Sequence, residues 1–234
     1  MQGFTAALAA FVLLHVGVSA TGLRGVLVAR LGERVYRLVF ALASAALLIW
    51  LCVEYAQLRA DATDPLNEII WTPPLWLRAI GYALIAFGML SAVIGVLTRG
   101  PTFMGMENTV NDPDPVRGML RITRHPFLWG VVFWAAGHLL VNGERFAPML
   151  FGALGVMVLL GVRSIDRKGA ARNPEGWARF EAATSSIPFA AIIQGRNSLK
   201  LGEIGWRALV AIIVLAGVGL GHRLLFGVAA FPGT

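Results

Sequence analysis

Four histidines are the residues of this chain best suited to chemistry, and all lie within or at the end of apolar runs: His15, His125, His138 and His222. His125 and His138, 13 residues apart, bracket an apolar segment that holds no other ionisable group. An ionisable side chain is costly in hydrocarbon, so one that persists there indicates a functional site by default. The long polar segments contain no histidine, a placement that chance does not favour.

Three kinds of role are open to histidines in such a setting. Imidazole is an axial ligand of haem iron, and facing helices of a bundle can hold a porphyrin. Histidine also hydrogen-bonds neighbouring helices, or relays protons. No acidic cluster accompanies the histidines at metal-site spacing, which disfavours zinc and di-iron carboxylate centres.

The elements that must position these residues are membrane helices. Hydrophobic residues make up 57% of the chain and charged residues 14%, far from a soluble domain. The apolar runs are about the length that crosses the hydrocarbon core, and they lack the alternation of barrel strands. We therefore predict an all-α, polytopic transmembrane helical bundle of about six helices, forming one integral membrane domain over 1–234. The helices are expected near 4–23, 37–58, 76–98, 126–143, 146–164 and 206–227, with a cytoplasmic segment at 165–205.

The net charge of +7 is explained by topology. Of the 20 Lys and Arg residues, 16 fall in the connections after the first, third and fifth helices. The other four are Arg59, Arg78, Arg145 and Arg223. Because cytoplasmic loops carry the excess of basic residues, the odd-numbered connections should be cytoplasmic and both termini periplasmic. A nucleic-acid partner is not expected.

Helix geometry sorts the histidines by depth. Proline suits the first helical position, so a helix should begin at Pro126, which leaves Arg124 and His125 at the cytoplasmic boundary. His138 then lies roughly 20 Å deeper, at 1.5 Å per residue. His15 falls about two-thirds of the way along the first helix, near the middle of the bilayer, and His222 lies near the outer end of the last helix. His15 and His138 are therefore the pair expected to share a site, with His222 a third candidate.

Other stretches carry weaker expectations. The early part of segment 165–205 is predicted to form a surface helix with Trp177 and Phe180 facing the lipid. Glycines at 217, 219 and 221, and at 17, 22 and 25, are expected to allow close helix packing in the last and the first helix. Cys52 is the only cysteine, which excludes an internal disulfide and any CxxC motif.

Several motifs together resemble the NnrU family of bacterial membrane proteins. They span nearly the whole chain and lie at 15–24, 115–118, 121–126, 129–130, 137–143 and 184–189. The resemblance implies a bacterial inner-membrane protein associated with denitrification, that is, with nitrite and nitric oxide reduction.

The same domain occurs in 15-cis-zeta-carotene isomerases, to which this chain is similar at the histidines. In those enzymes two histidines hold a haem b that is the redox-sensitive catalytic centre. The matching positions are His15 and His138, which would act as axial ligands, and thus as metal ligands, through the haem iron. One departure is the longer path from His15 to Arg24, which favours NnrU over the isomerases. The resemblance leaves open a lipophilic small molecule or a redox gas as ligand, and a membrane protein as partner.

A second resemblance concerns Arg124, His125 and Pro126, followed by Gly130. This element is similar to the RHPxxxG motif of membrane methyltransferases that use S-adenosylmethionine. Their later paired-glutamate signature is only partly matched here, by Asp166, Glu175 and Glu181. For Arg124, an interfacial anchor is the alternative role.

Overall fold

The computed structural model describes residues 2–19 and 21–230. Over these residues the secondary structure is helical, apart from one antiparallel bridge between Ile69 and Glu144. The apolar helices are α1 (Gln2–Leu13), α3 (Glu33–Ala60), α4 (Leu75–Leu97), α5 (Pro126–Val141), α6 (Ala153–Arg172) and α9 (Trp206–Phe226). Four of the described helices are long and apolar enough to cross a membrane. The number rises to five if the first helix and the helix bent away from it, Leu23–Leu31, are counted together as one span. Helix α5 is apolar but shorter. The chain is an all-α, polytopic bundle.

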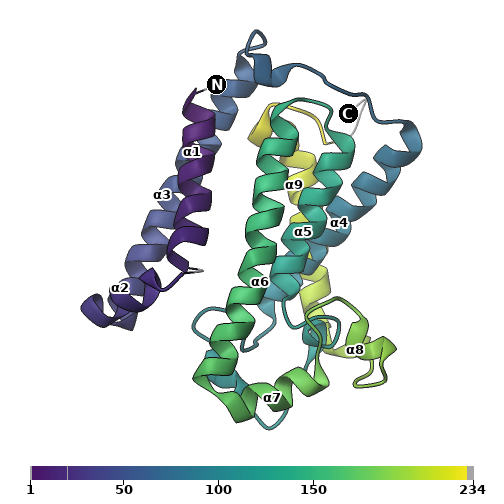
Figure 1. Ribbon diagram of the computed structural model, residues 1–234. Coiled ribbons are helices and arrows are strands. Elements are labelled where there is room, and N and C mark those ends of the chain that lie inside the picture. The colour runs from purple at the N-terminus through teal and green to yellow at the C-terminus, as the bar shows by residue number, and fades with distance from the viewer. Residues whose placement is uncertain (1, 20, 231–234) are drawn as a thin grey trace.

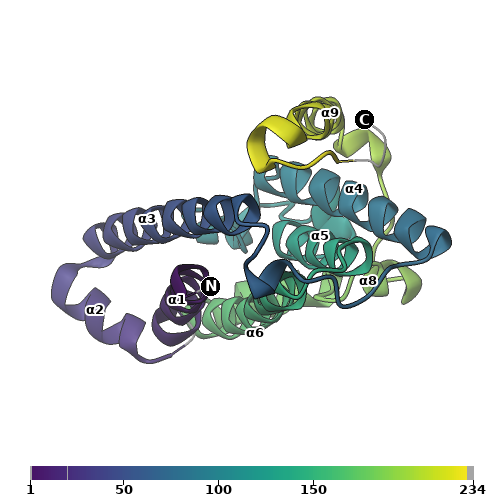
Figure 2. The same ribbon diagram turned by 90° about the horizontal axis from the view of Figure 1, so that it is seen from above.

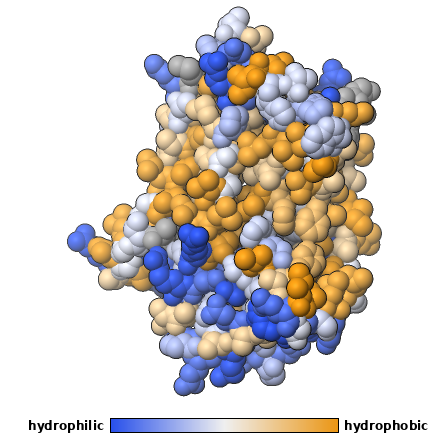
Figure 3. Space-filling view, turned by 45° about the vertical axis from the view of Figure 1, so that its right-hand side comes forward, coloured by the Kyte–Doolittle hydropathy of each residue, from blue (hydrophilic) through white to orange (hydrophobic). Residues whose placement is uncertain are grey.

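The bundle has two polar ends and an apolar middle (Figure 3). The start of α1 and the end of α9 lie at one end, and the short helices α2 (Leu23–Leu31), α7 (Pro174–Ala183) and α8 (Ala190–Ile193) lie toward the other (Figure 1). This second end collects the connections in which 16 of the 20 basic residues fall. The charge asymmetry of the sequence is therefore also an asymmetry of the fold.

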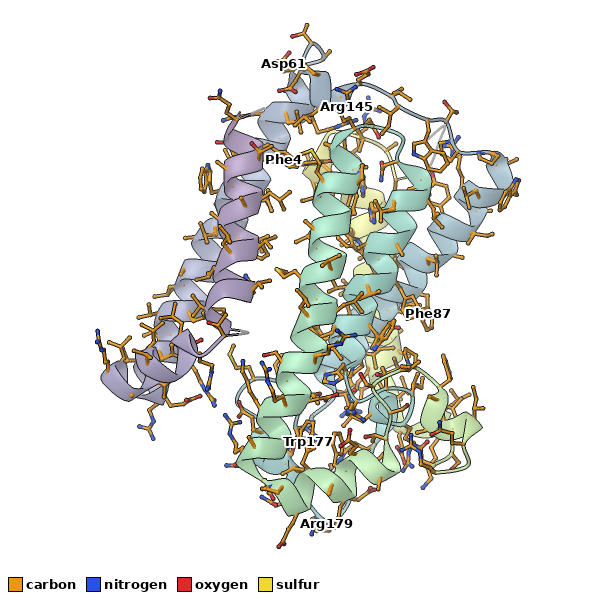
Figure 4. All side chains as sticks on the ribbon, viewed as in Figure 1. Phe4, Asp61, Phe87, Arg145, Trp177 and Arg179 are labelled. Carbon is orange, nitrogen blue, oxygen red and sulfur yellow. The ribbon has the colours of Figure 1, made fainter. Side chains whose placement is uncertain are left out.

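Seen from above, α4, α5 and α6 form the centre of the molecule (Figure 2). The α1–α3 hairpin lies on one flank, where α1 contacts α6, and α9 lies on the other flank against α4. A core of buried apolar side chains joins α1 and α3 to the start of the α6 segment, and includes Phe4, Leu8, Leu51, Phe146 and Phe151. Phe4 lies at the top of α1 beside α6 (Figure 4).

The antiparallel pair α4 and α5 packs through glycine. Both helices carry glycine at seven-residue spacing, on the faces that meet: Gly81, Gly88 and Gly95 in α4, Gly130 and Gly137 in α5. A Cβ atom at Gly88 would stand 2.5 Å from the backbone nitrogen of Trp134, and one at Gly130 2.5 Å from that of Ala92. Small residues let helix backbones approach closely in membranes, where packing replaces the hydrophobic effect. This interface holds α5, and with it His138, rigidly against α4.

The first apolar helix differs from the expected span of 4–23. Helix α1 ends at Leu13 and continues as a π-helical turn over Leu14–Ser19, after which α2 runs at 79° to it. Residue 20 lies outside the described residues. Arg24 and Arg30 make α2 too basic to continue through hydrocarbon, which explains why the chain turns toward the polar end.

Two further expectations were wrong. Trp177 and Phe180 do not face lipid: they are buried in a cluster with Val110 and Val116, because the chain turns at Asn173 and packs α7 onto the 98–125 connection. Close packing at the predicted glycines is not found: an added Cβ has nothing within 4 Å at Gly217, Gly219, Gly17, Gly22 or Gly25. Close packing involves the glycines of α4 and α5 instead. Helix α6 also runs on to Arg172, beyond the expected end at 164.

Candidate functional site

His15 lies in the π-helical turn that follows α1. It continues the stripe of Phe4, Leu8 and Phe11, spaced so that all four share the helix face that packs on the core. Its Nδ1 atom is 2.8 Å from the carbonyl oxygen of Phe11, and its ring packs at 4.4 Å from the Phe11 ring and 5.4 Å from that of Phe40, between centroids. Single π-helical turns are frequent at functional sites.

His138 lies one turn before the end of α5 in a similar environment. Its Nδ1 atom is 2.8 Å from the carbonyl oxygen of Trp134. The ring stacks on Phe151 with 4.5 Å between centroids, and lies at the same centroid distance from Trp134. Phe151 belongs to the core that also contains Leu8 of α1 and against which Trp134 packs, so this core packs against His138.

These hydrogen bonds fix the tautomer of both imidazoles. A carbonyl oxygen can only accept, so Nδ1 must carry the proton, and in the neutral ring the lone pair then lies on Nε2. No described residue hydrogen-bonds either Nε2 atom. A backbone carbonyl that accepts from Nδ1–H is also the usual outer-shell partner of a metal-bound histidine, and it raises the basicity of Nε2. In both side chains the Nε2 lone pair is therefore available to bind a metal.

The structure does not bring the two rings into contact. His15 is packed by Phe11 and Phe40, and His138 by Trp134 and Phe151. That His15 and His138 bind the same haem stays a prediction.

His222, the third candidate, lies near the end of α9. Its Nδ1 atom donates to the carbonyl of Val228 at 2.8 Å, and its ring is 4.8 Å from that of Phe226. His222 therefore has an Nδ1–carbonyl hydrogen bond like those of His15 and His138, but it lies in another helix and packs on a different ring.

Arg124 and His125 belong to a separate, buried ion-pair network at the basic end. The Arg124 guanidinium binds both Asp166 oxygens, at 3.0 and 2.9 Å, and one Glu181 oxygen at 2.7 Å. Nε2 of His125 is 2.7 Å from Asp166, and its Nδ1 is buried with no partner among the described residues. The side chains of Arg124 and His125 are only 7% and 0% exposed. A cofactor contact at this motif would require the network to open.

The same motif anchors segment 184–189, another of the stretches that resemble the NnrU family. The Arg124 amide donates to Ser185 O at 2.9 Å, the Trp129 indole to Ser186 O at 2.7 Å, and the Phe189 amide to Ile122 O at 2.7 Å. Two motifs more than 50 residues apart in sequence are therefore one structural unit. It closes the basic end of the bundle and fixes the start of α5.

Sequence reasoning missed Glu203, which anchors the adjacent stretch. Its carboxylate accepts two hydrogen bonds of 2.8 Å from Arg121 and one of 2.7 Å from the Gly118 amide. The hydrogen bond from Arg121 lowers the pKa of Glu203 from 4.5 to about 2. Asp166 was considered only as part of an incomplete methyltransferase signature. An isolated acid in the basic run 163–172 was the signal that it pairs with arginine.

The comparisons with known proteins agree with this architecture. A family model described as NnrU protein matches residues 3–230. The 15-cis-zeta-carotene isomerase of Zea mays is 29% identical to this chain, and the match covers 81% of this chain and 50% of the relative. The 15-cis-zeta-carotene isomerase of Arabidopsis thaliana is 28% identical, and the match covers 93% of this chain and 58% of the relative. Both relatives are chloroplastic, and the chain spans about half of their length. No solved structure matches.

Proposed function

Because the chain belongs to the NnrU family, we propose that it binds haem b through Nε2 of His15 and His138 and isomerises a lipophilic polyene between cis and trans forms. The proposal rests on the same hydrogen-bonding pattern and the same protonated nitrogen in these two histidines. Each donates Nδ1–H to the carbonyl four residues earlier and keeps Nε2 unpaired beside aromatic rings. The similarity to 15-cis-zeta-carotene isomerases supplies the substrate class.

The donor chemistry of the chain fits a haem. When bound, haem b would supply a redox-active iron, which is the chemistry that the side chains of the chain lack. His15 and His138 hold the iron, and the backbone carbonyls of Phe11 and Trp134 orient their rings. Phe40 and Phe151 provide flat apolar faces of the kind that pack against a macrocycle or a polyene.

Absorption spectra of the detergent-purified protein, expressed with ample haem, test the proposal. We expect a Soret band in the wild type that is lost or strongly shifted in both His15→Ala and His138→Ala. His222→Ala is the matched control, because its imidazole has the same Nδ1–carbonyl arrangement and a position in another helix. Absence of a Soret band in the wild type would refute haem binding. A band lost in His138→Ala and His222→Ala but kept in His15→Ala would assign the second ligand to His222.

Turnover tests the isomerase activity separately. The haem-loaded protein is incubated with 15-cis-zeta-carotene, and the geometric isomers are separated by chromatography. We expect loss of the 15-cis isomer in the wild type and not in either ligand variant. A wild type that binds haem but leaves the isomer ratio unchanged would contradict the polyene substrate.

A second candidate function is support of nitrogen-oxide metabolism in a bacterial inner membrane, with the iron sensing a redox gas. The path from His15 to Arg24 favours it, because this stretch departs from the isomerases and includes the π-helical turn that precedes α2. Nitrite consumption by a denitrifying host that lacks the gene tests it. We expect a defect that the wild type rescues and His15→Ala does not. An unchanged rate in the deletion strain would exclude this role.

A further inference from the structure

A cavity of about 230 Å³ lies at the basic end, between the α1–α3 hairpin and the α6–α7 corner. Its walls come from α2, α3, the 98–125 connection, α6 and α7. None of the side chains of the Arg124 network lines it, and its wall residue Phe40 packs against His15. The proposed function uses Phe40 but none of the charged residues of this cavity.

Four cations line the cavity: Arg24, Arg37, Lys168 and Arg172. They come from α2, α3 and α6, and Lys168 and Arg172 are one helical turn apart on α6. Lys168 is repelled by both Arg24 and Arg172, so the positive charges lie close to one another.

Two carboxylates offset only part of this charge. Glu33 is shared by Arg24 and Arg37, at 2.7 and 2.8 Å. Glu107 is shared by Arg37 and Arg172, at 3.0 and 3.5 Å. The formal charges of these four cations and two carboxylates sum to +2 around a partly enclosed space. Such an excess favours a bound anion, and arginine is suited to two-point binding of phosphate oxygens.

The remaining wall is apolar, with Phe40, Phe103, Met104 and Trp177 beside the cations. Apolar and cationic walls together fit the level of lipid headgroups, on the cytoplasmic side if the charge asymmetry sets the topology. Basic pockets between membrane helices on that side are suited to acidic lipid headgroups.

We propose that this cavity binds a phosphate group, supplied by an anionic phospholipid headgroup, and that the bound phosphate ties the hairpin to α6. Arg24 and Arg37 contribute from the hairpin and Lys168 and Arg172 from α6, so one anion bridges the two parts. The site does not depend on haem, and its test is made on the haem-free protein.

The experiment measures lipid binding by native mass spectrometry and the thermal unfolding temperature in detergent, with phosphatidylglycerol, phosphatidylcholine or inorganic phosphate added. We expect phosphatidylglycerol to bind and raise the unfolding temperature, and phosphatidylcholine to do neither. A comparable rise with inorganic phosphate alone would assign the site to free phosphate, whereas a rise with the lipid only would assign it to the headgroup. The same response to both lipids would overturn the proposal.

The double variant Lys168→Gln, Arg172→Gln removes two cations and should bind phosphatidylglycerol about thirtyfold more weakly. Arg78→Gln, at the opposite end of the bundle, is the matched control and should bind as the wild type does. Lys168→Arg keeps the charge and should keep binding. If the double variant fails to fold, Lys168→Gln alone should weaken binding about fivefold. Unchanged affinity in a folded Lys168→Gln variant would refute the site.

Discussion

Replacement of Gly88 by alanine tests the packing that holds α5 in place. The added Cβ would stand 2.5 Å from the Trp134 backbone nitrogen and 2.6 Å from the Gly130 carbonyl oxygen. Both contacts are with backbone, so no side-chain rotation relieves them, and α4 and α5 must separate. Overpacking costs about 1–3 kcal/mol, and a clash that only backbone movement relieves belongs at the upper end, about 3 kcal/mol.

For a chain of this length, such a loss lowers the unfolding temperature by about 6–12 °C. The assay is thermal unfolding in detergent, followed by circular dichroism. Gly219→Ala in α9 is the control, because nothing lies within 4 Å of its added Cβ, and it should be neutral or slightly stabilising. Equal unfolding temperatures for Gly88→Ala and Gly219→Ala would show that glycine packing does not fix α5.

Three further predictions concern the basic end and the topology. Asp166→Ala leaves Arg124 and His125 buried without their shared carboxylate, and should lower the free energy of unfolding by about 3 kcal/mol in chemical denaturation. The depressed pKa of Glu203 means that its ion pair stabilises the fold above about pH 4.5 and is lost as the pH falls toward 2. Glu203→Gln should therefore lower the free energy of unfolding by about 1–2 kcal/mol at pH 7. The difference in unfolding free energy between this variant and the wild type should shrink as the pH falls from about 4.5 toward 2. A difference that stays constant over this range would show that the Glu203 ion pair does not stabilise the fold. Alkaline phosphatase fused after α9 should be active and a fluorescent protein inactive, if both termini are periplasmic.

The sequence predicted the helices well because hydropathy and length determine which segments can cross a membrane. It also placed the basic connections at one end, since their charge follows from the same physics. Lateral packing was harder to predict. Seven-residue glycine spacing was visible in both α4 and α5, but only the structure shows that these faces meet.

For the candidate site too, positions along a helix could be predicted from the sequence, whereas contacts between distant segments could not. Depth along a helix separated His125 from His138 correctly, because both lie on one continuous helix or at its start. The partners of Arg124 come from residues 42 and 57 positions later, and depend on a turn at Asn173 that hydropathy does not reveal. Trp177 and Phe180 were misassigned for that reason: an amphipathic helix packs its apolar face on protein or lipid, and its sequence does not distinguish the two.

Low-temperature electron paramagnetic resonance of the oxidised, haem-loaded protein tests the central claim most directly, because the signal reports the iron ligands themselves. Two imidazole ligands predict a low-spin signal in the wild type and in His222→Ala. His15→Ala and His138→Ala should each convert it to a high-spin signal with one imidazole missing. A low-spin signal that survives in both of these variants would contradict the assignment of His15 and His138 as the ligands.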